Sequence, residues 1–344
     1  MDFSPPSSAD TTPDFGFLNP LKPTVVFSTY WRFAVERQEV YFRRVCGAQL
    51  PWSLDPVLRI HKFTNAYRAA DRVSQYLIRH VIGEDFRPAE DTFFRILLFK
   101  LFNRIETWEL IVEHLGQPSA REFDVERYDR ILSKAFERGE RLYSAAYIMP
   151  SGGKSGFSRK HTMHLHLLKQ MLQEKLPARI AEAGSMERAF ELLRACPTIG
   201  DFLAYQFVTD LNYSRLTDFK EDEFVVPGPG AKGGIEKCFS DLGGMSEADA
   251  IRLVTERQED CLRALGLQFP TLWGRRLQLI DCQNLFCEVN KYARVAHPEF
   301  CDKAGRTRIK QKLRPKDELP IPLFPAKWGI NDLLLNPPAY VPSP

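Results

Sequence analysis

Acidic side chains gather in two stretches of the sequence where they could take part in proton transfer. Glu221, Asp222 and Glu223 adjoin one another, and a carboxylate can act as a general base. A second, mixed set recurs at helical intervals: Asp281, Asn284, Glu288 and Lys291. We take Asp222, Glu223, Glu288 and Lys291 as candidate catalytic residues. The alternatives are a solvated turn for the first stretch and an intrahelical ion-pair ladder for the second.

A glycine-rich stretch directly follows the first acidic cluster. Residues 225–235 read Val-Val-Pro-Gly-Pro-Gly-Ala-Lys-Gly-Gly-Ile. Successive glycine amides can form a nest around a phosphate, and a lysine adds positive charge. The stretch therefore predicts phosphate-binding residues at Gly228, Gly230, Lys232 and Gly233. A purely structural turn is the alternative.

A further phosphate-binding element is predicted at residues 196–204, Cys-Pro-Thr-Ile-Gly-Asp-Phe-Leu-Ala. The pattern Pro-x-Ile-Gly-x-x-x-Ala is typical of helix-hairpin-helix modules, in which a tight turn presents backbone amides at a helix start. We expect Gly200 to permit the turn and a close backbone approach, and Ala204 to allow tight helix packing. The predicted DNA contacts are Pro197, Thr198, Ile199 and Gly200. An ordinary helix-helix corner is the alternative.

Charge points to local rather than protein-wide DNA binding. The 344 residues carry 47 Lys and Arg against 44 Asp and Glu, so the chain has no strong overall field. Residues 303–316, however, hold seven basic side chains and no acid, which favours contact with a polyanion. Within this stretch Arg306, Arg308 and Lys310 are predicted DNA contacts, and a solvated tail is the alternative.

Two weaker patterns favour neither a metal nor a nucleotide. His161, His164 and His166 do not share one helix face, and no Glu or Cys completes a known ligand set. Gly153-Lys154-Ser155 resembles the end of a P-loop, but Ile148 stands where its first glycine should be. We therefore predict no metal and no cofactor.

Cysteine usage and hydropathy indicate an intracellular protein. Seven scattered cysteines do not form the framework of a small secreted domain. The sequence has no basic start followed by an apolar stretch and no apolar run long enough for a membrane span. We expect no membrane association, and these features do not distinguish cytoplasm, nucleoid and nucleus.

The elements that must position these residues are expected to be helices. Apolar residues recur at helical spacing over nine segments: 30–45, 64–82, 89–102, 126–136, 161–172, 186–193, 202–211, 247–265 and 272–295. An all-α fold follows. Residues 1–23 predict a disordered arm, residues 24–316 a single large helical domain, and residues 317–344 a proline-rich strap.

The hairpin and the acids together resemble helix-hairpin-helix DNA glycosylases. Those enzymes place an essential Asp shortly after the hairpin glycine, and residues 221–223 stand at that distance. Two departures limit the likeness. Phe202 replaces the Schiff-base lysine of bifunctional members, and Cys282 with Cys287 supplies only one pair of the four-cysteine iron-sulfur spacing.

Several longer segments resemble one family, the helical domain associated with 5-hydroxymethyluracil DNA kinases, which is related to thymine-hypermodification pyrophosphorylases. The resemblance spans about residues 25–314, and the segments that carry it are 63–68, 98–109, 144–149, 200–214, 228–235 and 279–294. It implies a role in DNA base hypermodification, in which a hydroxymethyl group on uracil is phosphorylated and then displaced by an amine. Because the chain lacks a P-loop, a separate nucleotide or DNA kinase is the implied partner.

These observations lead to one main hypothesis and two alternatives. The main hypothesis is a DNA-binding protein that transfers an amine onto pyrophosphoryl-activated 5-hydroxymethyluracil. Asp222 or Glu223 would take the proton of the amine, and the glycine-rich stretch with Lys232 would hold the leaving pyrophosphate. The alternatives are a DNA glycosylase for a modified pyrimidine and a non-catalytic DNA-binding module that partners a DNA kinase.

Overall fold

The computed structural model describes residues 13–83, 87–147, 149, 156–300, 305–315 and 319–335. Helices dominate these residues, and the strands within them are β1 (Lys22–Pro23) and β2 (Phe239–Asp241), which pair antiparallel. The predicted all-α fold is confirmed. The chain forms two compact units. The first comprises Met1–Arg68, Pro227–Pro320 and Pro337–Pro344, and the second comprises Ala69–Val226 and Ile321–Asn336. A single domain over residues 24–316 stays a prediction.

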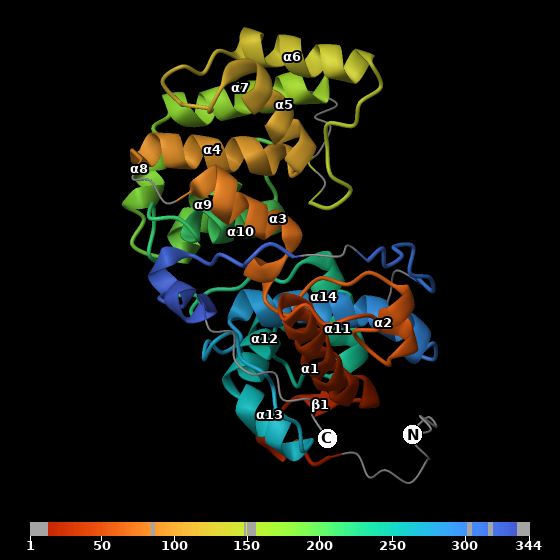
Figure 1. The fold of residues 1–344 in the computed structure, drawn as a ribbon. Coiled ribbons are helices and arrows are strands. Elements are labelled where there is room, and N and C mark those ends of the chain that lie inside the picture. Colours follow the sequence, from red (N-terminus) through yellow and green to blue (C-terminus); the bar gives the residue numbers. More distant parts are fainter. Residues whose placement is uncertain are drawn as a thin grey trace. The chain divides into compact units, whose positions relative to one another are not determined.

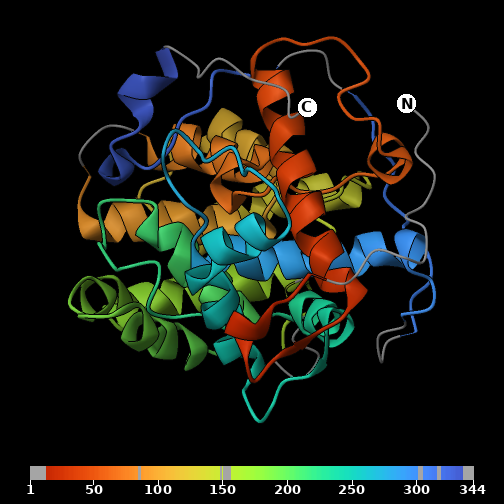
Figure 2. The same cartoon turned by 90° about the horizontal axis from the view of Figure 1, so that it is seen from below.

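The first unit is built around α14 (Leu279–Ala296), against which several helices pack. Figures 1 and 2 both show α1 crossing α14. The remaining elements of the unit are η1 (Gly16–Leu18), α1 (Val25–Val45), α2 (Pro56–Ile60), α11 (Pro229–Cys238), α12 (Glu247–Glu256) and α13 (Gln258–Ala264).

Local signals and apolar burial explain why α1 forms where it does. The Thr24 hydroxyl accepts a hydrogen bond from the Val26 amide at 3.2 Å and so caps the helix start. The buried face of α1 carries Phe27, Tyr30 and Trp31, each with no exposed surface. The Tyr30 ring packs 4.5 Å from the Phe286 ring of α14, so the crossing of the two helices is held by aromatic contacts.

Residues 13–23 fall within the segment predicted as a disordered arm, and residues 1–12 lie outside the described residues. Phe15, Leu18 and Leu21 are buried, and the following strand β1 pairs with β2. The apolar anchors of this short stretch therefore fasten it to the first unit.

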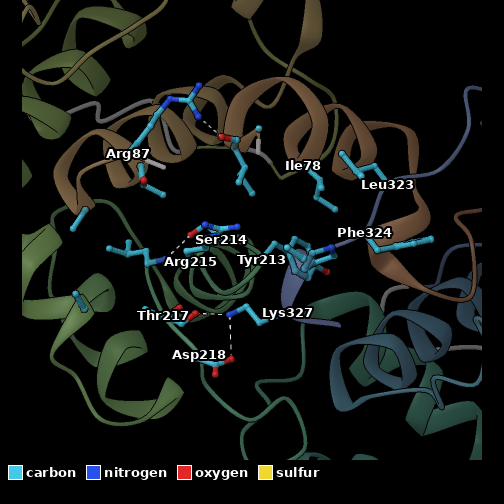
Figure 3. Close-up of a pocket in the computed structure, with 18 of the residues that line it drawn as sticks. Ile78, Arg87, Tyr213, Ser214, Arg215, Thr217, Asp218, Leu323, Phe324 and Lys327 are labelled. Carbon is cyan, nitrogen blue, oxygen red and sulfur yellow. Dashed lines mark hydrogen bonds and ion pairs between the residues drawn. The ribbon is translucent and has the colours of Figure 1, made fainter. Parts of the chain in front are cut away.

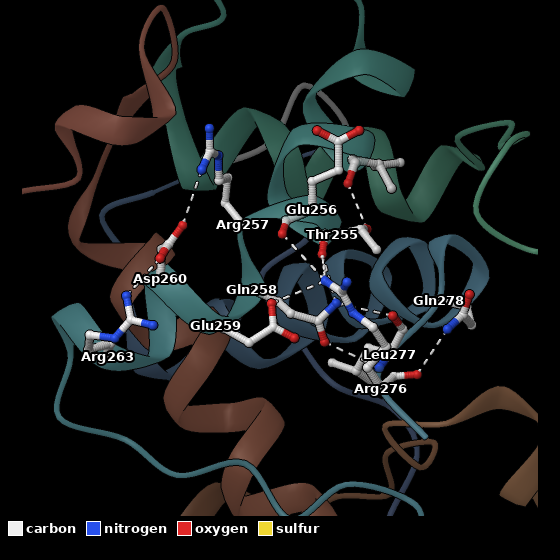
Figure 4. A network of polar contacts seen from close by, with 11 residues as sticks. Thr255, Glu256, Arg257, Gln258, Glu259, Asp260, Arg263, Arg276, Leu277 and Gln278 are labelled. Carbon is white, nitrogen blue, oxygen red and sulfur yellow. Dashed lines mark hydrogen bonds and ion pairs between the residues drawn. The ribbon is translucent and has the colours of Figure 1, made fainter. Parts of the chain in front are cut away.

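Polar contacts hold the segment that directly precedes α14 in the chain. Figure 4 shows the Arg276 guanidinium donating to the carbonyl oxygens of Thr255 at 2.9 Å and Glu256 at 3.4 Å. Gln258 donates to the Leu277 carbonyl at 3.1 Å and accepts from the Leu277 amide at 3.2 Å. These bonds tie the junction of α12 and α13 to the segment that leads into α14. Those of Arg276 also satisfy carbonyl groups at the end of α12, which have no partner within the helix.

The second unit has α4 (Ala89–Phe102) at its centre, in contact with α5, α7, α8 and α10. In Figure 1, α5–α7 lie on one side of α4 and α9 and α10 on the other. Its other elements are η2 (Arg68–Ala70, which begins at the unit boundary), α3 (Arg72–Tyr76), the π-helical turn η3 (Leu77–Ile82), α5 (Ile105–Leu115), α6 (Val125–Glu137), α7 (Lys160–Gln173), α8 (Leu176–Ala181), α9 (Met186–Arg194) and α10 (Asp201–Asn212).

Residues 321–335 fall within the segment 317–344 that was predicted as a proline-rich strap, and from here on the strap means residues 321–335. They are bound along the second unit and contain η4 (Ala326–Trp328) and η5 (Asn331–Leu335). The Gln75 amide group donates to the Leu323 carbonyl at 2.9 Å and accepts from the Leu323 amide at 2.9 Å. The Trp328 indole donates to Glu221 Oε1 at 2.8 Å. The Lys327 ammonium donates to the Thr217 carbonyl and lies 3.5 Å from Asp218 Oδ1. Polar contacts near the start and in the middle of the strap thus hold it to the unit.

Candidate functional site

Helices α9 and α10 contact each other and are joined by the turn at residues 195–200, where the sequence predicts a DNA-binding hairpin. Gly200 is the N-cap of α10 and has extended backbone angles, φ −88° and ψ 175°. The residue with left-handed angles is Thr198, at φ 66°. The turn therefore does not depend on the conformational freedom of Gly200, because any residue can adopt the backbone conformation found there.

The surroundings of Gly200 are open. A Cβ atom placed on Gly200 would meet no atom within 4 Å, and the first amides of α10 have no side-chain cap. Ile199 is buried and anchors the turn. Glycine at this position therefore leaves that space empty of side-chain atoms, and the close approach of a DNA backbone stays a prediction.

A shallow cavity of about 460 Å³ borders the same turn. Pro197 and Thr198 line it together with Phe157 and four polar side chains of α7: His166, Lys169, Gln170 and Gln173. The Phe157 ring is 41% exposed and stacks on the His166 ring at 4.8 Å. An exposed aromatic ring beside amide and basic groups is a surface on which nucleic acid bases can stack. The sequence analysis did not predict this surface of Phe157 and α7 beside the hairpin turn.

The basic stretch lies in the first unit, whereas the hairpin belongs to the second. Arg306, Arg308 and Lys310 are exposed, and Ile309 between them is buried. The backbone beyond them bonds to the end of α2, with the Leu313 amide donating to the Ile60 carbonyl at 3.0 Å. The three cations are thus held on the surface by an anchored backbone. Lys303 and Lys316, the ends of the predicted stretch, lie outside the described residues.

The acidic cluster forms a bend after α10 in the second unit. Asp222 and Glu223 are exposed, and Glu223 pairs with Lys220 at 2.7 Å. Glu221 accepts the bond from the Trp328 indole. Asp222 and Glu223 line neither the cavity beside the hairpin turn nor the larger cavity of the second unit, so their catalytic role stays a prediction.

The glycine-rich stretch forms helix α11 rather than a loop. A Cβ atom on Gly230 would lie 2.3 Å from Cys287 Sγ, and one on Gly234 would lie 2.0 Å from the Phe286 carbonyl oxygen. These two glycines therefore let α11 approach α14. Gly228 is the N-cap of α11 and Lys232 is half exposed, 3.9 Å from Glu247. Phosphate binding by Gly228, Gly230, Lys232 and Gly233 stays a prediction.

The polar face of α14 holds a neighbouring segment of the first unit. Glu288 is 6% exposed, and its Oε2 accepts from the Thr64 amide at 2.8 Å and from Lys291 Nζ at 2.7 Å. Asn284 donates to the Thr64 hydroxyl at 3.0 Å, and Lys291 Nζ lies 4.6 Å from the Phe63 ring centre. Glu288 and Lys291 thus form an intrahelical ion pair, which the sequence analysis gave as the alternative to a catalytic role. Glu288 also binds the backbone amide of Thr64. Its catalytic role stays a prediction.

The histidines of α7 make separate contacts. His161 Nε2 lies 3.0 Å from Ser133 Oγ, and burial lowers the pKa of His161 while Asp129 opposes this shift. His164 bonds the Tyr143 hydroxyl at 2.8 Å. In the described ranges, His, Cys, Asp and Glu form no group of three that could hold a metal ion. Residues 150–155, which include the P-loop-like Gly153–Ser155, lie outside those ranges.

A buried ion pair joins three of the segments that carry the family resemblance. Lys100 Nζ lies 3.1 Å from Asp210 Oδ2, with side chains 3% and 0% exposed. Lys100 also donates to Asn103 Oδ1 at 2.7 Å and lies 4.5 Å from the centre of the Tyr147 ring. The Tyr147 ring stacks on Phe202, at the start of α10, at 5.7 Å. The ion pair thus binds α10, the second helix of the hairpin, to α4.

The larger cavity of the second unit was also missed by sequence reasoning. It has a volume of about 870 Å³ and lies between the start of α4, the segment after α10 and the strap. Figure 3 shows Arg87 on one wall, Ser214 and Arg215 on the opposite wall, and Leu323 and Phe324 at the side. Because its lining comes from four separate parts of the chain, including Ala181 of α8, no single motif marks it.

Comparison of the sequence with those of known proteins identifies one family. A family model described as 5-hmdU DNA kinase, helical domain, matches residues 24–302. A 5-hmdU DNA kinase of Bacillus phage SP10 is 30% identical over 288 residues, which cover 78% of this chain and 45% of that protein. The chain therefore spans less than half the length of this curated relative. No solved structure matches it. Within the described ranges no helix combines the length and apolar character that a membrane span requires.

Proposed function

Since the chain belongs to the 5-hmdU DNA kinase helical-domain family, we propose that it binds DNA and takes part in the modification of 5-hydroxymethyluracil in DNA. The observation that carries the proposal is the turn before α10. Its glycine faces open space although its backbone angles do not demand glycine. A phosphate approaching the amides at the helix start would use that space.

The surface beside the turn supports the same proposal. Lys169 supplies charge, Gln170 and Gln173 supply amides, and the stacked pair Phe157–His166 supplies an exposed ring. Phosphate contacts position a protein on DNA, and aromatic rings receive bases that leave the stack. In the first unit Arg306, Arg308 and Lys310 add a second basic surface.

The finer form of the proposal is amine transfer. A separate kinase would supply the pyrophosphorylated hydroxymethyl group. The amine nitrogen would then bond to the methylene carbon, and the carbon–oxygen bond would break with its electron pair leaving on pyrophosphate. Asp222 or Glu223 would take the proton that the amine loses. Asp222 suits this role because its carboxylate is exposed and its neighbour Glu223 is the one paired with Lys220.

DNA binding is tested with variants at Gly200. Gly200→Val adds a branched side chain in front of the amides, so its affinity for duplex and single-stranded DNA is expected to fall on every sequence alike. Gly200→Ala adds a smaller group and is expected to have a smaller effect. Both should keep the helical circular dichroism of the wild type, since an added Cβ atom would meet no protein atom. Equal affinity for all three proteins would reject the hairpin as the DNA contact.

The basic surface is tested through salt dependence. Replacing Arg306, Arg308 and Lys310 with Ala should reduce the slope of log affinity against log salt by about 0.9 for each phosphate of duplex DNA that is no longer neutralised. Arg263→Ala is the matched control, since Arg263 is an exposed cation of the same unit outside the stretch. A folded wild type without salt-dependent DNA binding would overturn the proposed function.

Chemistry is tested with 5-pyrophosphoryloxymethyluracil DNA and a pool of amines, read by nucleoside mass spectrometry. Amine transfer yields a new nucleoside, and Asp222→Asn should abolish it while DNA affinity is kept. Release of free base and an abasic site would instead show a glycosylase. Intact DNA, together with co-purification of a kinase, would show a non-catalytic binding module.

A further inference from the structure

The larger cavity of the second unit carries more positive than negative charge. Of the described residues that line it, Arg87, Arg215 and Lys327 are cationic and Asp218 is the acid. The Lys327 ammonium and the Asp218 carboxylate lie 3.5 Å apart and offset each other. Arg215 is exposed, and among the described residues it has no hydrogen-bond or ion-pair partner. The Arg215 guanidinium is therefore available to an anion.

Helix α4 adds to this field because it begins at the cavity. Ala89 and Thr92 of its first turn line the cavity, and the N-cap Pro88 supplies no side-chain cap. The amide groups at a helix start carry partial positive charge. The acids of this turn do not line the cavity, and Asp91 accepts bonds from Ser119 Oγ at 3.1 Å and from a neighbouring amide at 2.6 Å. The helix start therefore favours an anion.

One side of the cavity is apolar and rigid. Phe324 is 1% exposed and stacks on Trp328 at a centroid distance of 5.9 Å, while Tyr213 meets the same indole edge-on at 5.8 Å. Ile78 and Leu323 complete this side. Figure 3 shows Ile78, Leu323 and Phe324 on the side of the cavity away from Arg215. A flat apolar group can lie against such a wall.

We propose that this cavity binds a small phosphorylated molecule that carries a flat apolar group, such as a nucleoside monophosphate. Arg215 and the start of α4 hold the phosphate, and the flat group lies against Leu323, which is partly exposed and is backed by the buried rings of Tyr213 and Phe324. Arg87 contributes charge from the opposite wall, where its guanidinium also donates to the Ile82 carbonyl. The inference does not depend on DNA binding at the hairpin, since none of the hairpin turn lines this cavity.

Calorimetric titration of the full chain tests the proposal with three probes: thymidine 5′-monophosphate, inorganic pyrophosphate and thymidine. The two phosphates are expected to bind at low ionic strength. Thymidine, which lacks the charge, should bind at least roughly tenfold more weakly than its monophosphate, because a hydrogen bond to a charged group contributes that much affinity or more. Failure of both phosphates to bind the folded wild type at millimolar concentration would overturn the proposal.

Arg215→Gln is the informative variant, because the side chain is exposed and its removal leaves the fold intact. It should weaken thymidine monophosphate binding about tenfold or more. Arg188→Gln, on α9 of the same unit, removes an equal charge outside the cavity and should leave the affinity unchanged. Equal affinities for the two variants would refute the assigned site.

Competition with a thymidine oligonucleotide identifies the source of the phosphate. A free nucleotide is the ligand if the oligonucleotide binds without displacing thymidine monophosphate. A nucleotide within DNA is the ligand if displacement occurs and Arg215→Gln weakens the oligonucleotide as well. Gly200→Val should impair DNA binding at the hairpin but leave monophosphate binding intact, so failure of the proposed function and failure of this inference give different results.

Discussion

Breaking the Lys100–Asp210 pair should destabilise the second unit far more than removing both charges together. The two groups are 3.1 Å apart and almost completely buried. Asp210→Leu leaves the ammonium of Lys100 beside Asn103 and the Tyr147 ring, neither of which carries a full negative charge. Lys100→Met leaves a carboxylate with no exposed surface. Each single variant thus retains a buried charge that has lost the oppositely charged group 3.1 Å away.

The expected magnitude follows from burial. Removal of one partner of a buried ion pair costs about 3–5 kcal/mol, which is a large part of the roughly 5–15 kcal/mol that stabilises a protein. Joint replacement by apolar side chains of similar size is often neutral or stabilising. We therefore expect Lys100→Met with Asp210→Leu to lie within about 2 kcal/mol of the wild type, after allowing for imperfect packing of the larger Leu.

Urea unfolding of the four proteins, followed by far-ultraviolet circular dichroism, measures these differences as a double-mutant cycle. The predicted coupling free energy is several kcal/mol and favours the pair. Single variants that are each destabilised by less than about 1 kcal/mol would refute the reasoning, since water would then reach the ion pair. A double variant as unstable as the sum of the singles would show that packing, rather than charge, sets the cost.

Three further predictions follow from the packing, the histidines and the cysteines. Gly234→Ala should lower the free energy of unfolding by more than about 2 kcal/mol in a urea titration, because its Cβ would overlap the Phe286 carbonyl; Gly200→Ala, with open space around it, should change it little. Burial lowers the pKa of His161, so the unfolded chain binds the proton more readily, and the free energy of unfolding should fall as the pH drops from about 7 through the lowered pKa. His161→Gln should make this fall smaller when unfolding is measured at several pH values, and an unchanged pH dependence would contradict the prediction. Among the described cysteines Cys46 is the exposed one, so a thiol reagent should label it first in the native protein, as peptide mapping will show.

Where a helix is encoded by nearby residues, its position could be read from the sequence. The predicted and observed bounds of α4 are the same, 89–102, while α9 is one residue longer than predicted at its C-terminal end and α10 is one residue longer at each end. Apolar spacing and local caps such as that of Ser185 on α9 act within a few residues of each other. The all-α fold and the resemblance to the family were accessible for the same reason.

Where contacts with distant parts of the chain decide the conformation of a segment, the local sequence pattern gave a wrong prediction. The glycine-rich stretch indicated a phosphate-binding nest or a structural turn, but from Pro229 onwards it forms α11, whose Gly230 and Gly234 allow contact with α14. Residues 272–278 continue the helical pattern of α14, yet the helix begins at Leu279. The Tyr67 hydroxyl accepts from the Leu272 amide at 3.2 Å and donates to the Arg275 carbonyl, so a residue far away in sequence holds this segment in a turn.

The sequence by itself determined the positions of helices such as α4, α9 and α10 and the segments that resemble a family, because periodicity, capping and motif identity are local properties. Only the tertiary structure decided that Lys100 and Asp210 meet, that the space around Gly200 is empty, and that Arg87, Arg215 and the strap line one cavity. The partner of a charge and the lining of a cavity depend on which helix faces pack together. That choice is made by apolar burial summed over the whole unit, and no single stretch of residues contains it.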